Sequence, residues 1–175
     1  MSNPANSSCV DLSGLWVPLV TPFDTNGAID HAALARLAKR LATAGVTGTV
    51  VCGSTGEAAA LDEGEQLAAL ETVAVAAPAL PRIVGLSGYH LGQTLAWVQR
   101  LNREAPTALL VPAPHYIRPS QQGLIDWFTS IAEASGATGA GAGRAQGVRA
   151  SEPCRNLSAQ GRGTGKPADG HRLQG

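Results

Sequence analysis

The sequence is poor in cysteine, and its three cysteines lie far apart. Cys9, Cys52 and Cys154 form no C-x-x-C pair, which excludes a zinc site of that spacing and a disulfide framework. The sequence also lacks a basic and then apolar leader, and its longest apolar run, residues 73 to 80, is interrupted by Pro78. These absences exclude a secretory signal and a membrane span, so we expect a cytoplasmic protein without membrane partners.

Aromatic residues and net charge are scarce as well. Aromatics make up 4% of the 175 residues, and 13 Lys and Arg balance 13 Asp and Glu, which argues against a protein that binds nucleic acid. All the aromatics precede Ser135, whereas residues 136 to 175 are rich in glycine and arginine. We therefore expect a disordered arm over residues 1 to 11, a folded region over 12 to 135, and a Gly/Arg-rich tail over 136 to 175 that cannot build a core.

The folded region alternates between two patterns. Short β-branched apolar runs occur at residues 15 to 20, 47 to 52, 83 to 86 and 108 to 111, and each is followed by a helical pattern. Asp30 is placed to cap the first helix, Asp62 with Glu65 the second, and Ser120 the fourth. The expected buried stripes are Leu34, Leu37, Ala38 and Leu41; Leu67, Leu70, Ala74 and Ala77; Leu91, Leu95, Val98 and Leu101; and Leu124, Trp127, Phe128 and Ile131.

Four strand–helix units in a row predict parallel strands with right-handed crossovers. Two architectures satisfy this pattern, an open doubly wound sheet and a (β/α)₈ barrel, and periodicity does not choose between them. A closed barrel typically needs about 250 residues. The barrel interpretation therefore means that only about the first four βα units are present, whereas an open sheet fits the length better.

The loop after the second predicted strand is the most informative motif. In Gly53-Ser54-Thr55-Gly56-Glu57, backbone N–H groups and two adjacent hydroxyls can converge on a small anion such as a carboxylate. An ordinary Gly-rich turn is the alternative. The motif is neither a phosphate P-loop nor a dinucleotide fingerprint, and His90 and His115 have no metal-ligand partner at a suitable spacing, so no cofactor or metal is predicted.

The loop after the fourth predicted strand contains three prolines, Pro112, Pro114 and Pro119, and ends at the Ser120 cap. Proline fixes backbone φ, so this loop suits holding Tyr116 at the mouth of the site. Stiffening by proline could equally serve packing only. Cys52, at the end of the second strand, is interpreted as a buried small hydrophobic residue and not as a nucleophile.

Three motifs carry a family resemblance over about residues 12 to 135. Leu19-Val20-Thr21-Pro22-Phe23, Gly53-Ser54-Thr55-Gly56-Glu57, and residues 115 to 124 (HYIRPSQQGL) resemble the dihydrodipicolinate synthase/N-acetylneuraminate lyase family of class I aldolases. The resemblance favours the (β/α)₈ barrel over the open sheet. The segment from Pro119 to Leu124 is more similar to the synthase branch than to the sialic-acid branch.

The resemblance also implies an activity and roles for site residues. It implies a carbon–carbon lyase that condenses pyruvate or another 2-keto acid with an aldehyde such as aspartate semialdehyde, through a lysine Schiff base and without a cofactor. Thr55, with Gly53 and Gly56 of its loop, matches the carboxylate-binding site. Ser54 and Tyr116 match the catalytic proton relay, with Tyr116 reaching into a neighbouring subunit of a homo-oligomeric dimer or tetramer.

The Schiff-base lysine of the family has no counterpart in this pattern. Lys39 is predicted on the polar face of the first helix, and Lys166 has no strand around it. We therefore expect this chain to be inactive as a synthase. The alternatives are a non-catalytic half-barrel that binds a small carboxylate or a partner chain, and another pyruvate-dependent aldolase of sugar acids. An out-of-frame translation or a fused segment after Ser135 would explain the tail, and reading the coding DNA in the other frames tests this hypothesis.

Overall fold

The computed structural model describes residues 11 to 114 and 117 to 135, and contains the four predicted strand–helix units. The units are β1 (Trp16–Pro18) and α1 (His31–Thr43), β2 (Gly48–Val51) and α2 (Glu63–Ala76), β3 (Arg82–Gly85) and α3 (Leu91–Leu101), and β4 (Ala108–Leu110) and α4 (Gln121–Ala134). Three 3₁₀ turns, η1 (Ser54–Gly56), η2 (Ala58–Ala60) and η3 (Asn102–Glu104), lie between them. The predicted arm and tail lie outside the described residues, apart from Asp11.

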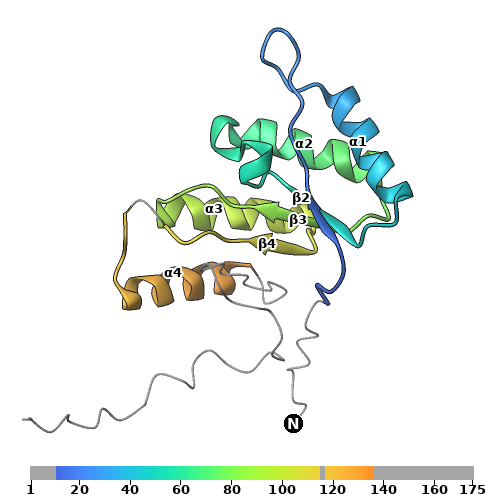
Figure 1. Cartoon of the computed structure of the whole chain (residues 1–175). Coiled ribbons are helices and arrows are strands. Elements are labelled where there is room, and N and C mark those ends of the chain that lie inside the picture. The colour runs from blue at the N-terminus through green and yellow to red at the C-terminus, as the bar shows by residue number, and fades with distance from the viewer. Residues whose placement is uncertain (1–10, 115–116, 136–175) are drawn as a thin grey trace, which may run out of the picture.

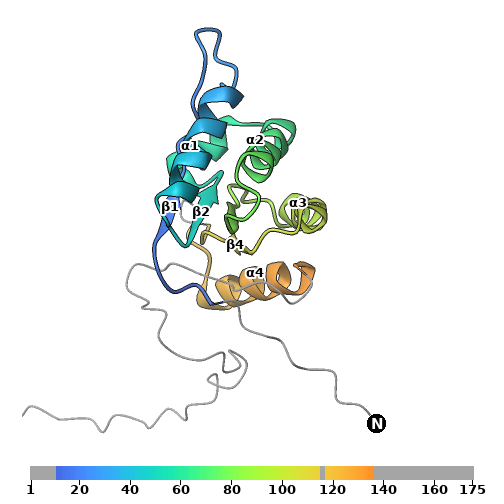
Figure 2. The ribbon, with the colours of Figure 1, turned by 90° about the vertical axis from the view of Figure 1, so that its right-hand side faces the viewer.

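The four strands form one parallel sheet in the order β1-β2-β3-β4, as the alternating pattern predicts. Pro18 pairs with Val50, Val50 with Ile83, and Ile83 with Ala108. The helices lie in an arc along one side of the sheet (Figures 1 and 2). A doubly wound sheet carries helices on both faces, so this arrangement is that of a barrel wall.

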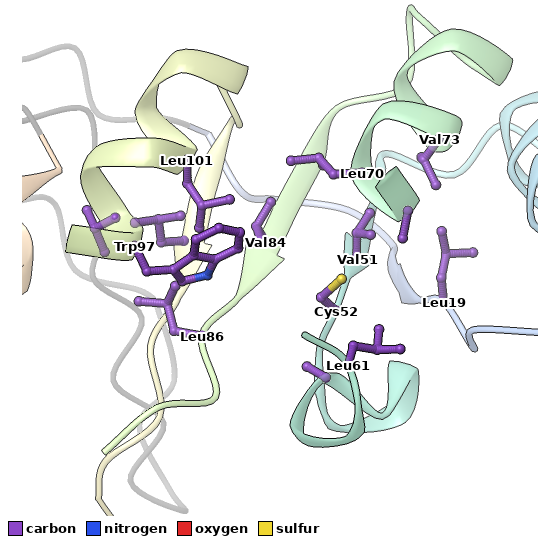
Figure 3. Close-up of a cluster of buried hydrophobic side chains, with 14 of the residues drawn as sticks. Leu19, Val51, Cys52, Leu61, Leu70, Val73, Val84, Leu86, Trp97 and Leu101 are labelled. Carbon is purple, nitrogen blue, oxygen red and sulfur yellow. The ribbon is translucent and has the colours of Figure 1, made fainter. Parts of the chain in front are cut away.

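The two faces of the sheet bury different residues. Val51, Val84 and Leu109 point toward the helices and belong to the main core, which Figure 3 shows around Leu70 of α2 and Leu101 of α3. Their strand neighbours Val50, Ile83 and Ala108 form a smaller cluster on the other face, with Leu12, Trp16 and Leu110 packed against it. This alternation along each strand separates a helix-covered outer face from an apolar inner face.

The predicted helix caps are confirmed. The Asp30 side chain accepts from the Ala33 N–H at 2.8 Å, and Asp62 and Glu65 form the reciprocal capping box at the start of α2. Ser120 Oγ accepts from the Gly123 N–H at 3.1 Å at the start of α4. Each cap satisfies backbone donors that the first turn of a helix leaves without acceptors, so these polar residues set where the helices begin.

The predicted stripe of α2 is partly wrong. Its buried residues are Gln66, Ala69, Leu70 and Val73, whereas Leu67 and Ala74 are only half-buried. Apolar residues occur around most of this helix, so the sequence does not single out one face. In α3, Trp97 and Thr94 are buried with the predicted Val98 and Leu101, while Leu91 is exposed.

Candidate functional site

The residues predicted to bind a carboxylate lie where β2 ends. Residues 53 to 57 leave the strand at its C-terminal end, on the same side of the sheet as the C-terminal ends of the other parallel strands. Ligand sites in such folds lie at these C-terminal ends. Ser54 and Thr55 are exposed, while Gly53 and Gly56 on either side are buried. The two hydroxyl residues are thus open to solvent, while the glycines on either side pack against the protein.

The turn η1 fixes the backbone around these hydroxyls. The Gly56 N–H donates to the Gly53 carbonyl at 3.0 Å, and the Glu57 N–H donates to the Ser54 carbonyl at 3.2 Å. Within the described part of the chain, no hydrogen bond engages the N–H groups or hydroxyls of Ser54 and Thr55. Hydroxyls and N–H groups are donors for a carboxylate, so the exposed turn offers a small anion four donor groups.

Two non-glycine residues in the left-handed region flank this turn. Cys52 has φ of 53°, and Glu57 has φ of 54° with ψ of 35°. A side chain in this region costs of order 1 kcal/mol or more, so the surrounding contacts must hold the loop in its observed shape. The loop therefore stores strain beside the exposed hydroxyls.

Two side chains hold this loop through three hydrogen bonds. Thr21 Oγ1 donates to the Gly56 carbonyl at 2.7 Å, and Gln66 Nε2 donates to the Ala58 and Leu61 carbonyls at 3.0 and 3.2 Å. Both side chains are buried. Thr21 is part of the first family motif, but neither its contact nor Gln66 was predicted, since a threonine at a strand end and a glutamine on a helix carry no local signal for a contact across the fold.

Cys52 is a buried residue, as predicted. Its side chain is 2% exposed and lies between Val51 and Leu61 (Figure 3). Burial raises the pKa of the Cys52 thiol from 9.0 to about 11, so the nucleophilic thiolate is scarce at neutral pH. The thiol therefore packs in the main core beneath the loop and is not a reactive nucleophile.

We expect the stability of the fold to decrease as pH rises from 9 to 11. The thiol is neutral in both states below the unfolded pKa of 9.0, and above it the unfolded state loses its proton first, until the folded pKa of about 11 is passed. The expected loss is about 2 to 3 kcal/mol in the free energy of unfolding, measured by urea titration at the two pH values. Cys52→Ala is the control, and an equal loss in that variant would contradict the assignment.

The other sequence-predicted residues are placed as follows. Tyr116 and His115 lie outside the described residues, but the loop before them is held by Trp127, whose Nε1 donates to the Pro112 carbonyl at 3.2 Å. His90 caps α3, with its Nδ1 accepting from the Gln93 N–H at 3.2 Å. Among residues 11 to 114 and 117 to 135, no group of three or more His, Cys, Asp and Glu side chains is placed to hold a metal ion.

Lys39 lies on the exposed face of α1, as predicted. It lines a surface groove with Thr47 and Pro81, which precede β2 and β3, so it lies at the opposite end of the strands from Ser54. Lys166 lies outside the described residues. None of the helices that the structure describes is both long and apolar enough to cross a membrane.

Comparison with known proteins identifies what this geometry resembles. Residues 11 to 138 match the model of the "Dihydrodipicolinate synthetase family". The 4-hydroxy-tetrahydrodipicolinate synthase of Haloarcula marismortui is 37% identical over 127 residues, which are 73% of this chain and 42% of that protein. The Mycobacterium leprae synthase is 38% identical over 125 residues, 71% of this chain and 42% of its own length.

Solved structures give the same result. Dihydrodipicolinate synthase from Bacillus anthracis superposes with a TM-score of 0.65 at 32% identity, over 69% of this chain and 42% of that one. Proteus mirabilis N-acetylneuraminate lyase gives 0.67 at 27% identity, over 71% and 43%. The matched region belongs to a (β/α)₈ barrel in these relatives, which confirms the barrel prediction over the open sheet. The chain spans about two-fifths of the length of the curated relatives.

Proposed function

The chain belongs to the dihydrodipicolinate synthetase family, and from this premise we propose that its Ser54–Gly56 turn binds the carboxylate of pyruvate or another 2-keto acid. The two relatives compared by sequence above are 4-hydroxy-tetrahydrodipicolinate synthases, which supports the synthase type of carbon–carbon lyase as the activity to which this site belongs. Aspartate semialdehyde is the proposed second substrate, and the cytoplasm the proposed location.

The observation that carries the proposal is a pair of exposed hydroxyl residues on a turn whose backbone is fixed by a buried hydrogen bond. Ser54 and Thr55 are exposed at the ligand-binding edge, and the buried Thr21 hydroxyl holds the following Gly56 carbonyl at 2.7 Å. Thr55 and the backbone at Gly53 and Gly56 bind the carboxylate in this proposal. Ser54 lies next to them, where it can donate a proton to the keto oxygen and take one back from the hydroxyl that forms there.

The relay needs more than Ser54. A serine hydroxyl with an ordinary pKa is a poor acid, so it shuttles protons efficiently only beside a group whose charge changes. Tyr116 is the proposed second member of the relay, reaching the site from a neighbouring subunit of a dimer or tetramer. The amine that would form the Schiff base is not supplied by the described residues, in which Lys39 is the single lysine and lies at the other end of the strands.

The position of Lys39 also favours a second candidate function. Without an amine near Ser54, the described part would bind a keto acid without covalent chemistry, as a non-catalytic half-barrel. The edges of β1 and β4, each paired on one side within the described residues, would then be the surface for a partner chain. N-acetylneuraminate lyase among the neighbours keeps an aldolase of sugar acids as a further alternative at the same turn.

We expect pyruvate to bind the full chain through the hydroxyls and to leave Lys39 unmodified. Binding is followed by ligand-observed NMR, and covalent capture by borohydride reduction with peptide mass mapping. Ser54→Ala combined with Thr55→Val should weaken binding by at least tenfold, because two hydroxyl donors to a charged acceptor are removed.

Thr129→Val, which changes an exposed threonine on α4, is the matched control and should leave binding unchanged. Equal binding by the double variant and the wild-type chain would overturn the proposed carboxylate site. A reduced adduct on Lys166 would show that the chain forms a Schiff base with pyruvate and would support the aldolase function. Binding without an adduct on either lysine would favour the non-catalytic half-barrel.

A further inference from the structure

We propose that Thr21 is a positioning residue for the Ser54–Gly56 turn, an inference that rests on the proposed carboxylate site. Thr21 Oγ1 donates to the Gly56 carbonyl at 2.7 Å, and the two residues are 35 positions apart in the chain. Thr21 is only 7% exposed, so water does not compete freely for this bond. The bond joins the segment after β1 to the loop after β2.

The bond acts on the turn because Gly56 is held at both ends. Its N–H donates to the Gly53 carbonyl at 3.0 Å, and its own carbonyl receives the Thr21 hydroxyl. The orientation of both peptide groups is therefore set, and the two residues between Gly53 and Gly56 are the exposed Ser54 and Thr55. Fixing the ends of so short a segment fixes the direction of the donors on it.

The contact between the two segments is close as well as bonded. A Cβ atom added at Gly56 would lie 3.0 Å from the Leu19 carbonyl oxygen and 3.4 Å from Thr21 Oγ1. The turn thus packs directly on the residue that follows the first strand, and a side chain at Gly56 would be tightly crowded there. Glu57, which follows in the left-handed region, can keep that conformation because the preceding carbonyl is held in place.

Gln66 holds the part of the loop that follows Glu57, so its role differs from that of Thr21. Its amide donates to the Ala58 and Leu61 carbonyls, which lie after Glu57 in and beyond η2. Gln66 therefore attaches residues 58 to 61 to α2. Thr21 instead bonds the peptide group next to the Ser54 and Thr55 donors. We assign the positioning role to Thr21 for this reason.

The experiment compares Thr21 with a second buried threonine. Each donates its hydroxyl to a backbone carbonyl and so links the first strand–helix unit to the second. Thr49 Oγ1 donates to the Val17 carbonyl at 2.8 Å, away from the turn, and Thr49 is 0% exposed. Thr21→Val and Thr49→Val each remove one such bond while keeping the side-chain shape. We expect Thr21→Val to weaken pyruvate binding about tenfold, Thr49→Val to change it less than about twofold, and Thr21→Ser to restore it.

Amide hydrogen exchange gives a second readout that does not need pyruvate. The Gly56 and Glu57 N–H groups, which bond within the turn, should exchange at least about tenfold faster in Thr21→Val than in Thr49→Val. Equal exchange at these amides in the two variants would overturn the positioning role. Failure of the wild-type chain to bind pyruvate, with the difference in exchange retained, would instead overturn the proposed function and leave Thr21 as the residue that holds the turn.

Discussion

Replacing Gly85 by alanine is expected to destabilise the fold by about 3 kcal/mol or more and to disrupt the candidate site. Gly85 is buried at the end of β3, beside the end of β2. An added Cβ would lie 2.3 Å from the Cys52 carbonyl oxygen and 2.8 Å from the Gly53 Cα. Both are backbone atoms, so no side-chain rotation relieves the overlap and the strands must shift.

The shift would occur where the exposed turn begins, because Gly53 precedes Ser54. We therefore expect Gly85→Ala to lose pyruvate binding together with stability, measured by urea unfolding and ligand-observed NMR. Gly53→Ala is the matched control for stability, since its φ is −78° and its added Cβ meets only Val50 Cγ1 at 3.4 Å. A Gly85→Ala chain as stable as Gly53→Ala would show that the strand ends separate more easily than the structure indicates.

The second large effect is expected for Leu101→Ala in α3. Leu101 is 0% exposed and packs near Val84 and Trp97 in the main core (Figure 3). Removing a fully buried leucine side chain typically costs about 2 to 5 kcal/mol, from lost transfer energy and the cavity left behind. Domains of ordinary size are stable by about 5 to 15 kcal/mol, so this change removes a large share of the total.

Urea unfolding followed by circular dichroism measures this loss, and Val75→Ala provides the control. Val75 lies on α2 and is 76% exposed, so its truncation should change the free energy of unfolding by less than about 0.5 kcal/mol. Similar losses for the two variants would mean that α3 is not packed on the sheet as described.

The sequence predicted the elements of this fold well because their signals are local. Asp30, Asp62 and Ser120 cap helices within three residues of themselves, and the apolar runs coincide with strands to within one or two residues at each end. The face of α2 was harder to predict, because alanine and valine lie on several sides of that helix. Only the packing against α1 and the sheet selects Ala69 and Val73 as the buried side.

The candidate site was predicted in part for the same reason. Ser54 and Thr55 belong to a contiguous motif that the family resemblance identifies, and the structure places them exposed at a strand end. Thr21 and Gln66 act through bonds to carbonyls elsewhere in the chain, and a carbonyl has no residue-specific signature in a sequence. Such partners become visible only when the fold brings the two segments together.

The order of the strands has a consequence for how the chain is made. Each strand pairs with the strand synthesised just before it, at a separation of roughly 30 residues, and no described strand waits for a distant partner. Closing a loop of about 30 residues costs less entropy than closing a longer one, because this cost grows with loop length. The sheet can therefore grow by one unit at a time as the polypeptide leaves the ribosome, each new strand using the edge of the last as its template.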